Sequence, residues 1–93
     1  DRSPSRGLGD VYKRQILYEV YNMNISAFSE RLKDLRIDAG MTSDQLAKRI
    51  GVTKSTISFW ENGVNEPKAS YIVAVAKVFS VSSDYLLGLK DTI

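Results

Sequence analysis

The chain has 93 residues, 43% hydrophobic and 26% charged, a composition that fits one small globular domain and argues against a wholly disordered chain. It contains no cysteine and no histidine, which excludes disulfide bonds, Cys/His zinc sites and Cys- or His-based catalysis. The net charge of +2 is compatible with nucleic-acid binding but is too small to predict it. No apolar run approaches the ~20 residues that a membrane-spanning helix needs.

The first fifteen residues, DRSPSRGLGDVYKRQ, differ from the rest because they show no helical or strand period and do not begin with methionine. They resemble a translated sequencing-adapter tail, and we exclude them from the fold prediction. A disordered basic arm that reaches DNA is the alternative. A signal peptide is excluded because the apolar run at 16–20 is short, contains Glu19 and lacks a cleavage site.

Residues 16–22 (ILYEVYN) are ambiguous. Their β-branched and aromatic content is typical of a short strand, but they are equally consistent with translated leader DNA before Met23. We therefore expect a non-native or disordered leader at 1–22, and one domain at 23–93 that starts naturally at Met23.

Short amphipathic helices are predicted after the leader. A first helical face ends before Gly40, and a second helix begins at Thr42, where Gln45 three residues later completes a capping box. Thr53 is the expected cap of a third helix that Asn62-Gly63 ends. The apolar faces of these three helices comprise Phe28, Leu32, Leu35 and Ala39; Leu46, Ala47 and Ile50; and Ile57 and Trp60.

Two further helices are predicted towards the end of the chain. Pro67 suits the first turn of a fourth helix. Backbone N–H groups in a first turn have no acceptor within the helix, so a residue without an N–H costs nothing there. Ser82 is the expected cap of a short last helix. Their apolar positions are Ile72, Val75, Ala76 and Phe79, and then Leu86 and Leu87.

The second and third expected helices are joined by only three residues, Gly51-Val52-Thr53. A turn this tight makes the helices cross steeply, at about 90–120° in helix-turn-helix units. The crossing needs a small residue where the two backbones approach each other, and Ala47 is in that position. The turn needs a residue with positive φ, which Gly51 adopts without steric cost. The pattern therefore predicts a helix-turn-helix at about 42–62.

The sequence TSDQLAKRIGVTKSTIS at 42–58, followed by WENG at 60–63, resembles the Cro/C1-type (XRE) helix-turn-helix family of repressors. The resemblance runs from about 25 to 89 and includes Pro67 and the S-x-x-Y-L-L-G ending at 82–88. It implies an all-α fold, a compact five-helix lambda-repressor-like domain. It also implies a cytoplasmic transcriptional regulator that binds double-stranded DNA without a cofactor.

The resemblance assigns site residues position by position. The third helix becomes the recognition helix in the major groove, and the second helix crosses the DNA backbone. The implied base contacts are Lys54, Ser55, Thr56 and Phe59, and the implied phosphate contacts are Thr42, Ser43, Ser58, Asn62, Asn65 and Lys68. No catalytic residue and no metal ligand is implied.

Three positions depart from the family pattern. Ser43 stands where a bridging Gln is frequent and is too short to reach both phosphate and the recognition helix. Phe59 replaces a polar or basic residue, which shifts the expected readout towards DNA shape and thymine methyl groups. Ser80 replaces a glycine, so strain is expected after the fourth helix.

Some conspicuous residues are expected to be structural. Trp60 belongs to the core, because it lies on an inward helical face. Arg36 and Glu61 match a family pair that links the first and third helices. Tyr71 and Tyr85 are expected at the rim of the core.

Three classes of function compete. The first is a repressor that binds an inverted-repeat operator as a homodimer and blocks polymerase access. The second is an antitoxin or another protein-binding module with a toxin or other protein partner. The third, an enzyme, has no nucleophile motif or phosphate-binding glycine loop to support it.

Overall fold

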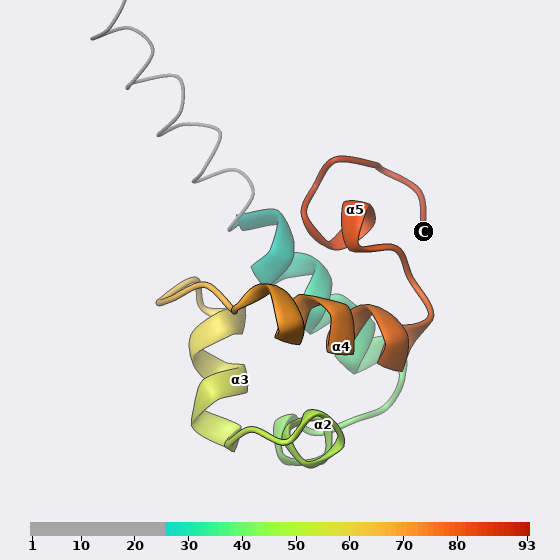
Figure 1. The fold of residues 1–93 in the computed structure, drawn as a ribbon. Coiled ribbons are helices and arrows are strands. Elements are labelled where there is room, and N and C mark those ends of the chain that lie inside the picture. Colours follow the sequence, from blue (N-terminus) through green and yellow to red (C-terminus); the bar gives the residue numbers. More distant parts are fainter. Residues whose placement is uncertain (1–25) are drawn as a thin grey trace, which may run out of the picture.

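The structure, a computed structural model, describes residues 26–93. The expectations for the leader and for Met23 lie outside this range. Within it, no strand is present, and a first helix that includes residues 26–38 precedes four others (Figure 1). These are α2 (Ser43–Ile50), α3 (Lys54–Glu61), α4 (Ala69–Phe79) and α5 (Ser83–Leu86). The predicted all-α, five-helix architecture is confirmed.

One apolar core joins all of these helices. Its buried side chains come from the first helix, α2, α3, α4 and α5: Phe28, Leu32, Leu46, Ala47, Ile57, Trp60, Val75 and Leu86. Each was predicted from helical periodicity. Leu35, Ile50, Ile72, Ala76 and Phe79 are only partly buried and pack against this cluster, and Leu87 is also half-buried. Among the described residues, no helix is both long and apolar enough to cross a bilayer.

The prediction for Ala39 is wrong. The first helix ends at residue 38, and Ala39 is exposed in the turn that follows. Gly40 adopts φ 69°, its N–H donates to the Ile37 carbonyl at 2.9 Å, and the Met41 N–H donates to Arg36 at 3.0 Å. The left-handed turn thus leaves the helical path before the apolar repeat reaches Ala39.

The start of the fourth helix also differs from the prediction. Pro67 precedes α4 instead of occupying its first turn, since Lys68 is the N-cap, with φ −66° and an extended ψ of 157°. Helical backbone therefore begins at Ala69. Lys68 makes no side-chain hydrogen bond to the helix end.

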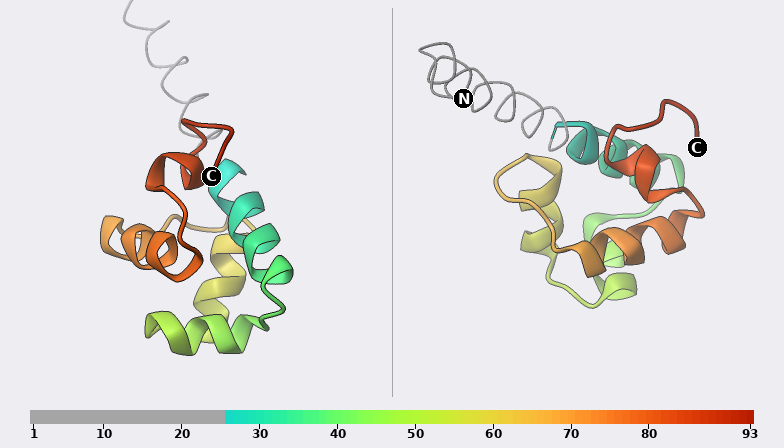
Figure 2. Two further views of the ribbon diagram at one scale, coloured as in Figure 1. Left: turned by 90° about the vertical axis from the view of Figure 1, so that its right-hand side faces the viewer. Right: turned by 45° about the horizontal axis from the view of Figure 1, so that its top comes forward.

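The predicted helix-turn-helix is present at the expected residues. Gly51 adopts φ 88°, and the Ala47 carbonyl accepts the N–H groups of Gly51 at 2.8 Å and of Val52 at 3.0 Å. Ala47 itself is buried in the core cluster. Figures 1 and 2 show that α2 and α3 cross steeply. Gly51 and Ala47 thus have the structural roles that the sequence predicts.

Trp60 is at the centre of the packing, as expected. Its ring meets Phe28 edge-on at a centroid distance of 6.3 Å and lies 5.4 Å from Tyr71. The buried hydroxyl of Ser29 donates to the Trp60 carbonyl at 2.6 Å. These contacts fix the end of α3 against the first helix and α4.

The last helix is also attached to the first helix. The Arg31 guanidinium lies 4.3 Å from the centre of the Tyr85 ring and donates to the Tyr85 carbonyl. It also donates to the Lys90 carbonyl at 2.6 Å. Tyr85 is half-buried, which agrees with its expected place at the rim of the core.

Ser80 is in the strained backbone conformation that its position predicted. It ends α4 with φ 55°, where a glycine costs nothing, and the Val81 N–H donates to the Ala76 carbonyl at 3.0 Å. A residue with a side chain pays roughly 1–2 kcal/mol of folding free energy to adopt a positive φ. Glycine avoids this cost, but it makes the unfolded chain more flexible, which cancels part of the gain in stability.

We therefore predict that Ser80→Gly raises the free energy of unfolding by about 0.5–1 kcal/mol in urea denaturation. Lys77→Gly is the matched control, because a glycine at this exposed position inside α4 should lower the free energy of unfolding by about 1 kcal/mol. Destabilisation by Ser80→Gly would show that the left-handed turn carries no strain.

Candidate nucleic-acid interface

The N-terminus of α2 is capped but keeps donors for an anion. The Thr42 hydroxyl accepts the Gln45 N–H at 3.1 Å, and the Thr42 N–H donates to the Gln45 side chain at 2.8 Å. This is the predicted capping box. The N–H groups of Ser43 and Asp44, which have no intrahelical acceptor, remain at the helix end, where the helix dipole favours negative charge.

Asp44 is a feature of this end that the sequence analysis missed. Its carboxylate lies in the first turn of α2, where it carries the same sign of charge as a phosphate. The Lys48 ammonium lies 3.2 Å from that carboxylate, one turn along the helix. Both side chains are largely exposed, so this pair reduces the local negative charge and contributes little to stability.

The predicted base contacts in the first turn of α3 differ in exposure. Lys54 and Ser55 are exposed in the first turn of the helix. Thr56 is half-buried, and its hydroxyl lies 2.9 Å from the Thr53 hydroxyl, which also accepts the Thr56 N–H at 3.2 Å. Thr56 is thus engaged in the cap, and its hydroxyl faces Thr53.

The two sides of α3 differ sharply in burial. Ile57 and Trp60 are buried, whereas Ser58 and Phe59 are exposed. The Phe59 side chain retains 46% of its surface accessible, so the ring is not a core residue. Together with Lys54 and Ser55, these side chains give α3 one basic, polar and aromatic outer face.

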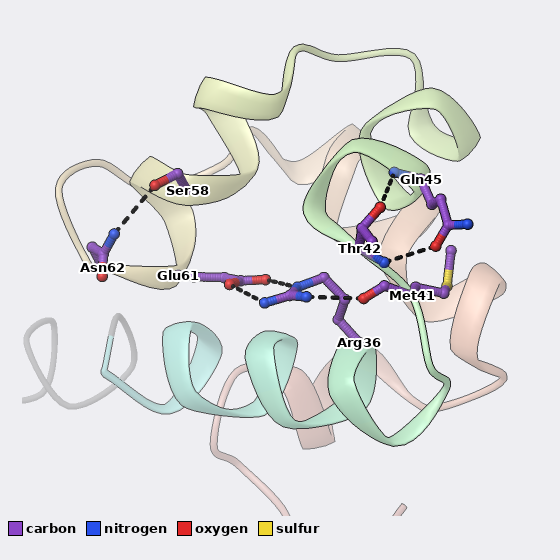
Figure 3. A network of polar contacts seen from close by, with 7 residues as sticks. All are labelled: Arg36, Met41, Thr42, Gln45, Ser58, Glu61 and Asn62. Carbon is purple, nitrogen blue, oxygen red and sulfur yellow. Dashed lines mark hydrogen bonds and ion pairs between the residues drawn. The ribbon is translucent and has the colours of Figure 1, made fainter.

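The loop after α3 brings two predicted phosphate contacts together. The Asn62 side chain donates to the Ser58 hydroxyl at 3.3 Å (Figure 3). This hydroxyl keeps its own hydrogen for a further acceptor. Asn65 and Lys68 are exposed further along the same segment. The predicted phosphate residues therefore fall into two groups, one at the start of α2 and one in the second half of α3 and the loop after it.

An ion pair between Arg36 and Glu61 connects the end of α3 to the first helix. The Arg36 guanidinium donates to the Glu61 carboxylate at 2.6 and 3.0 Å and to the Met41 carbonyl at 2.9 Å (Figure 3). The two side chains are only 14% and 7% exposed. Hydrogen bonding to Glu61 raises the pKa of Arg36 above its ordinary value. The pair joins the first helix, the segment before α2 and the end of α3, which agrees with its expected structural role.

A helix-turn-helix family profile matches residues 32–86 of the chain. The regulator YobD of Bacillus subtilis, an uncharacterized HTH-type transcriptional regulator, is 38% identical over 64 residues, which are 69% of this chain and 57% of that protein. The CTXphi repressor RstR of Vibrio cholerae is 31% identical over 70% of this chain and 59% of its own length. The chain thus spans little more than half the length of these relatives.

Two solved structures have a similar fold. The P22 c2 repressor in complex with a synthetic operator has a TM-score of 0.62 and 33% identity, over 64% of this chain and 91% of that chain. The repressor LexA of Eubacterium rectale has a TM-score of 0.66 and 28% identity, over 69% of this chain and 68% of that chain. These proteins are named as transcriptional regulators and repressors, not as enzymes.

We predict that Arg36→Ala lowers the free energy of unfolding by about 3 kcal/mol, because it leaves the buried Glu61 carboxylate without its partner. Arg49→Ala, which removes an exposed guanidinium from α2, is the control and should change stability by less than about 0.5 kcal/mol. Chemical denaturation measures both. Equal effects of the two substitutions would contradict the structural role of the pair.

Proposed function

Since this chain belongs to the Cro/C1-type helix-turn-helix family, we propose that it is a sequence-specific DNA-binding transcriptional regulator. The observation that carries the proposal is the outer face of α3. Lys54, Ser55 and Phe59 are exposed there, while the inner face is buried in the core. A rigid helix with such an exposed face is the element that reads base edges in the major groove.

In the proposed complex, α3 enters the major groove with its N-terminal turn first. The Lys54 ammonium donates to guanine O6 or N7, and the Ser55 hydroxyl is able to donate or accept at a neighbouring base. Thr56, whose hydroxyl lies 2.9 Å from that of Thr53, supports the helix end and remains a candidate base contact beside Ser55.

Phosphate contacts at both ends of α3 position that helix on the duplex. At α2, the N–H groups of Ser43 and Asp44 receive one phosphate, with the Asp44 charge offset by Lys48. Beyond α3, the Ser58–Asn62 pair, Asn65 and Lys68 receive another. Contacts of this kind fix orientation and supply most of the affinity, whatever the sequence.

We further propose that the protein acts as a repressor and as a homodimer. Two copies of α3, separated by about one DNA turn of ~34 Å, would match an inverted-repeat operator. The bound dimer then blocks access of polymerase to the promoter.

Selection of bound duplexes from a random DNA pool at near-physiological salt tests this function. We expect convergence on an inverted repeat whose half-site spacing reflects the dimer. Weak, salt-sensitive retention without a consensus would contradict sequence-specific regulation and favour a protein-binding module, such as an antitoxin with a toxin partner.

Two lysines separate base reading from phosphate contact on the selected operator. Lys54→Ala should weaken binding by about 1–3 kcal/mol and relax the preference at one base pair. Lys68→Ala should weaken binding similarly on every sequence and lower the salt dependence by about one unit of slope. Fluorescence anisotropy over a range of salt concentrations measures both effects.

Lys33→Ala on the first helix is the matched control, because Lys33 is exposed but outside the proposed interface. It should leave operator preference and salt slope unchanged. A uniform loss of affinity in Lys54→Ala, with base preference intact, would make Lys54 a phosphate contact.

A further inference from the structure

The turn after α3 contains the one Asn-Gly pair of the chain, Asn62-Gly63. Asn62 is the C-cap of α3, and both residues are exposed. An Asn-Gly pair is chemically labile, because glycine has no side chain to keep its backbone nitrogen away from the preceding side-chain amide. The Asn62 amide is also one of the proposed phosphate contacts. A change in its chemistry therefore falls within the proposed DNA interface.

The reaction that such a pair undergoes needs only water. The Gly63 backbone nitrogen attacks Cγ of Asn62 and closes a succinimide ring, while the Asn62 side-chain nitrogen leaves as ammonia with the proton of the Gly63 N–H. Water then opens the ring at either carbonyl and leaves an aspartate or an isoaspartate at position 62. The sum converts an amide and water into a carboxylic acid and ammonia, without oxidation or reduction. At neutral pH the new acid is a carboxylate.

The end of α3 holds this pair away from the reactive arrangement. Asn62 has φ −98° and ψ 2°, and its backbone N–H donates to the Ser58 carbonyl at 3.0 Å. The Gly63 N–H donates to the Trp60 carbonyl at 3.2 Å, and the Asn62 side chain donates to the Ser58 hydroxyl at 3.3 Å (Figure 3). Ring closure needs Asn62 to rotate about ψ until the Gly63 nitrogen faces its Cγ. The last two of these hydrogen bonds must therefore open first.

This opening is accessible to the free chain and opposed by DNA. The bonds are few, they lie at a helix end, and water competes for them because both residues of the pair are exposed; such ends open at low free energy. In the proposed complex, the second N–H of the Asn62 amide donates to a phosphate oxygen. That bond exists only while the amide stays beside Ser58, so bound DNA holds the unreactive arrangement.

We propose that Asn62-Gly63 is a site of spontaneous deamidation that removes the free protein from the DNA-binding pool, and that bound DNA protects it. This switch rests on the proposed DNA-binding function. A carboxylate at position 62 carries the same charge as the phosphate that the amide would receive, so the two repel each other. Because ammonia is lost, the change is irreversible and marks the age of the free chain.

Peptide mapping of the full chain by mass spectrometry, during incubation at neutral pH, measures the amide-to-acid conversion at each asparagine. Asn65 is the internal control, because it is exposed in the same loop but the side chain of Glu66 hinders ring closure there. We expect conversion at Asn62 while Asn65 stays largely unchanged. Unfolding in urea should speed the conversion of Asn62 about tenfold, the equivalent of about one net hydrogen bond.

Protection by DNA is measured in the same way. The selected operator, at a free concentration about ten times its dissociation constant, leaves about a tenth of the chain unbound and should slow conversion of Asn62 about tenfold. A scrambled duplex at the same concentration is the matched control and should protect far less.

The effect on binding is measured with variants of the full chain. Asn62→Asp carries the charge of the product and should raise the dissociation constant for the operator about tenfold, with a smaller penalty at high salt. Asn62→Ala removes the amide without adding charge and should lose less affinity. Thr92→Asp adds the same charge at an exposed residue outside the proposed interface and should leave binding unchanged.

Equal and negligible conversion of Asn62 and Asn65 in the folded chain would overturn the inference. Conversion that the operator slows no more than the scrambled duplex would overturn it too, as would unchanged operator binding by Asn62→Asp. Each of these results leaves the proposed function intact. Absence of any selected consensus would refute the proposed function, and the DNA-protected switch with it.

Discussion

Gly51 adopts φ 88° while the Ala47 carbonyl accepts two N–H groups, so α2 ends and α3 begins within three residues. The left-handed backbone and the small buried side chain are both needed, because a bulkier residue at position 47 would push the helices apart. The steep crossing that follows turns α3 across the end of α2. Every later feature, from the burial of Trp60 to the exposure of Phe59, depends on that orientation.

The inner side of α3 is fixed by bonds of several kinds. Glu61 pairs with Arg36 of the first helix, Ser29 donates to the Trp60 carbonyl, and the Trp60 ring packs between Phe28 and Tyr71. A helix anchored this way keeps its outer side chains in one arrangement before any ligand arrives. Preorganisation of this kind reduces the ordering cost of binding and sharpens discrimination between partners.

Local signals in the sequence predicted the fold well. The capping box at Thr42, the left-handed Gly51 and the apolar positions other than Ala39 depend on nearby residues, and they are confirmed. The misplaced features depend on detail that periodicity does not encode. Ala39 falls outside the core because the chain turns at Gly40, and Pro67 lies before α4 because helical backbone begins only at Ala69.

We propose that the outer face of α3 meets the DNA bases, while α2 and the loop after α3 hold the DNA backbone. Backbone amide shifts of the full chain, followed by NMR during titration with the selected duplex, test it most directly. The account predicts the largest changes at 43–44, 54–59 and 62–65. Changes concentrated in α5 and residues 87–93, with the amides of α3 unaffected, would contradict it.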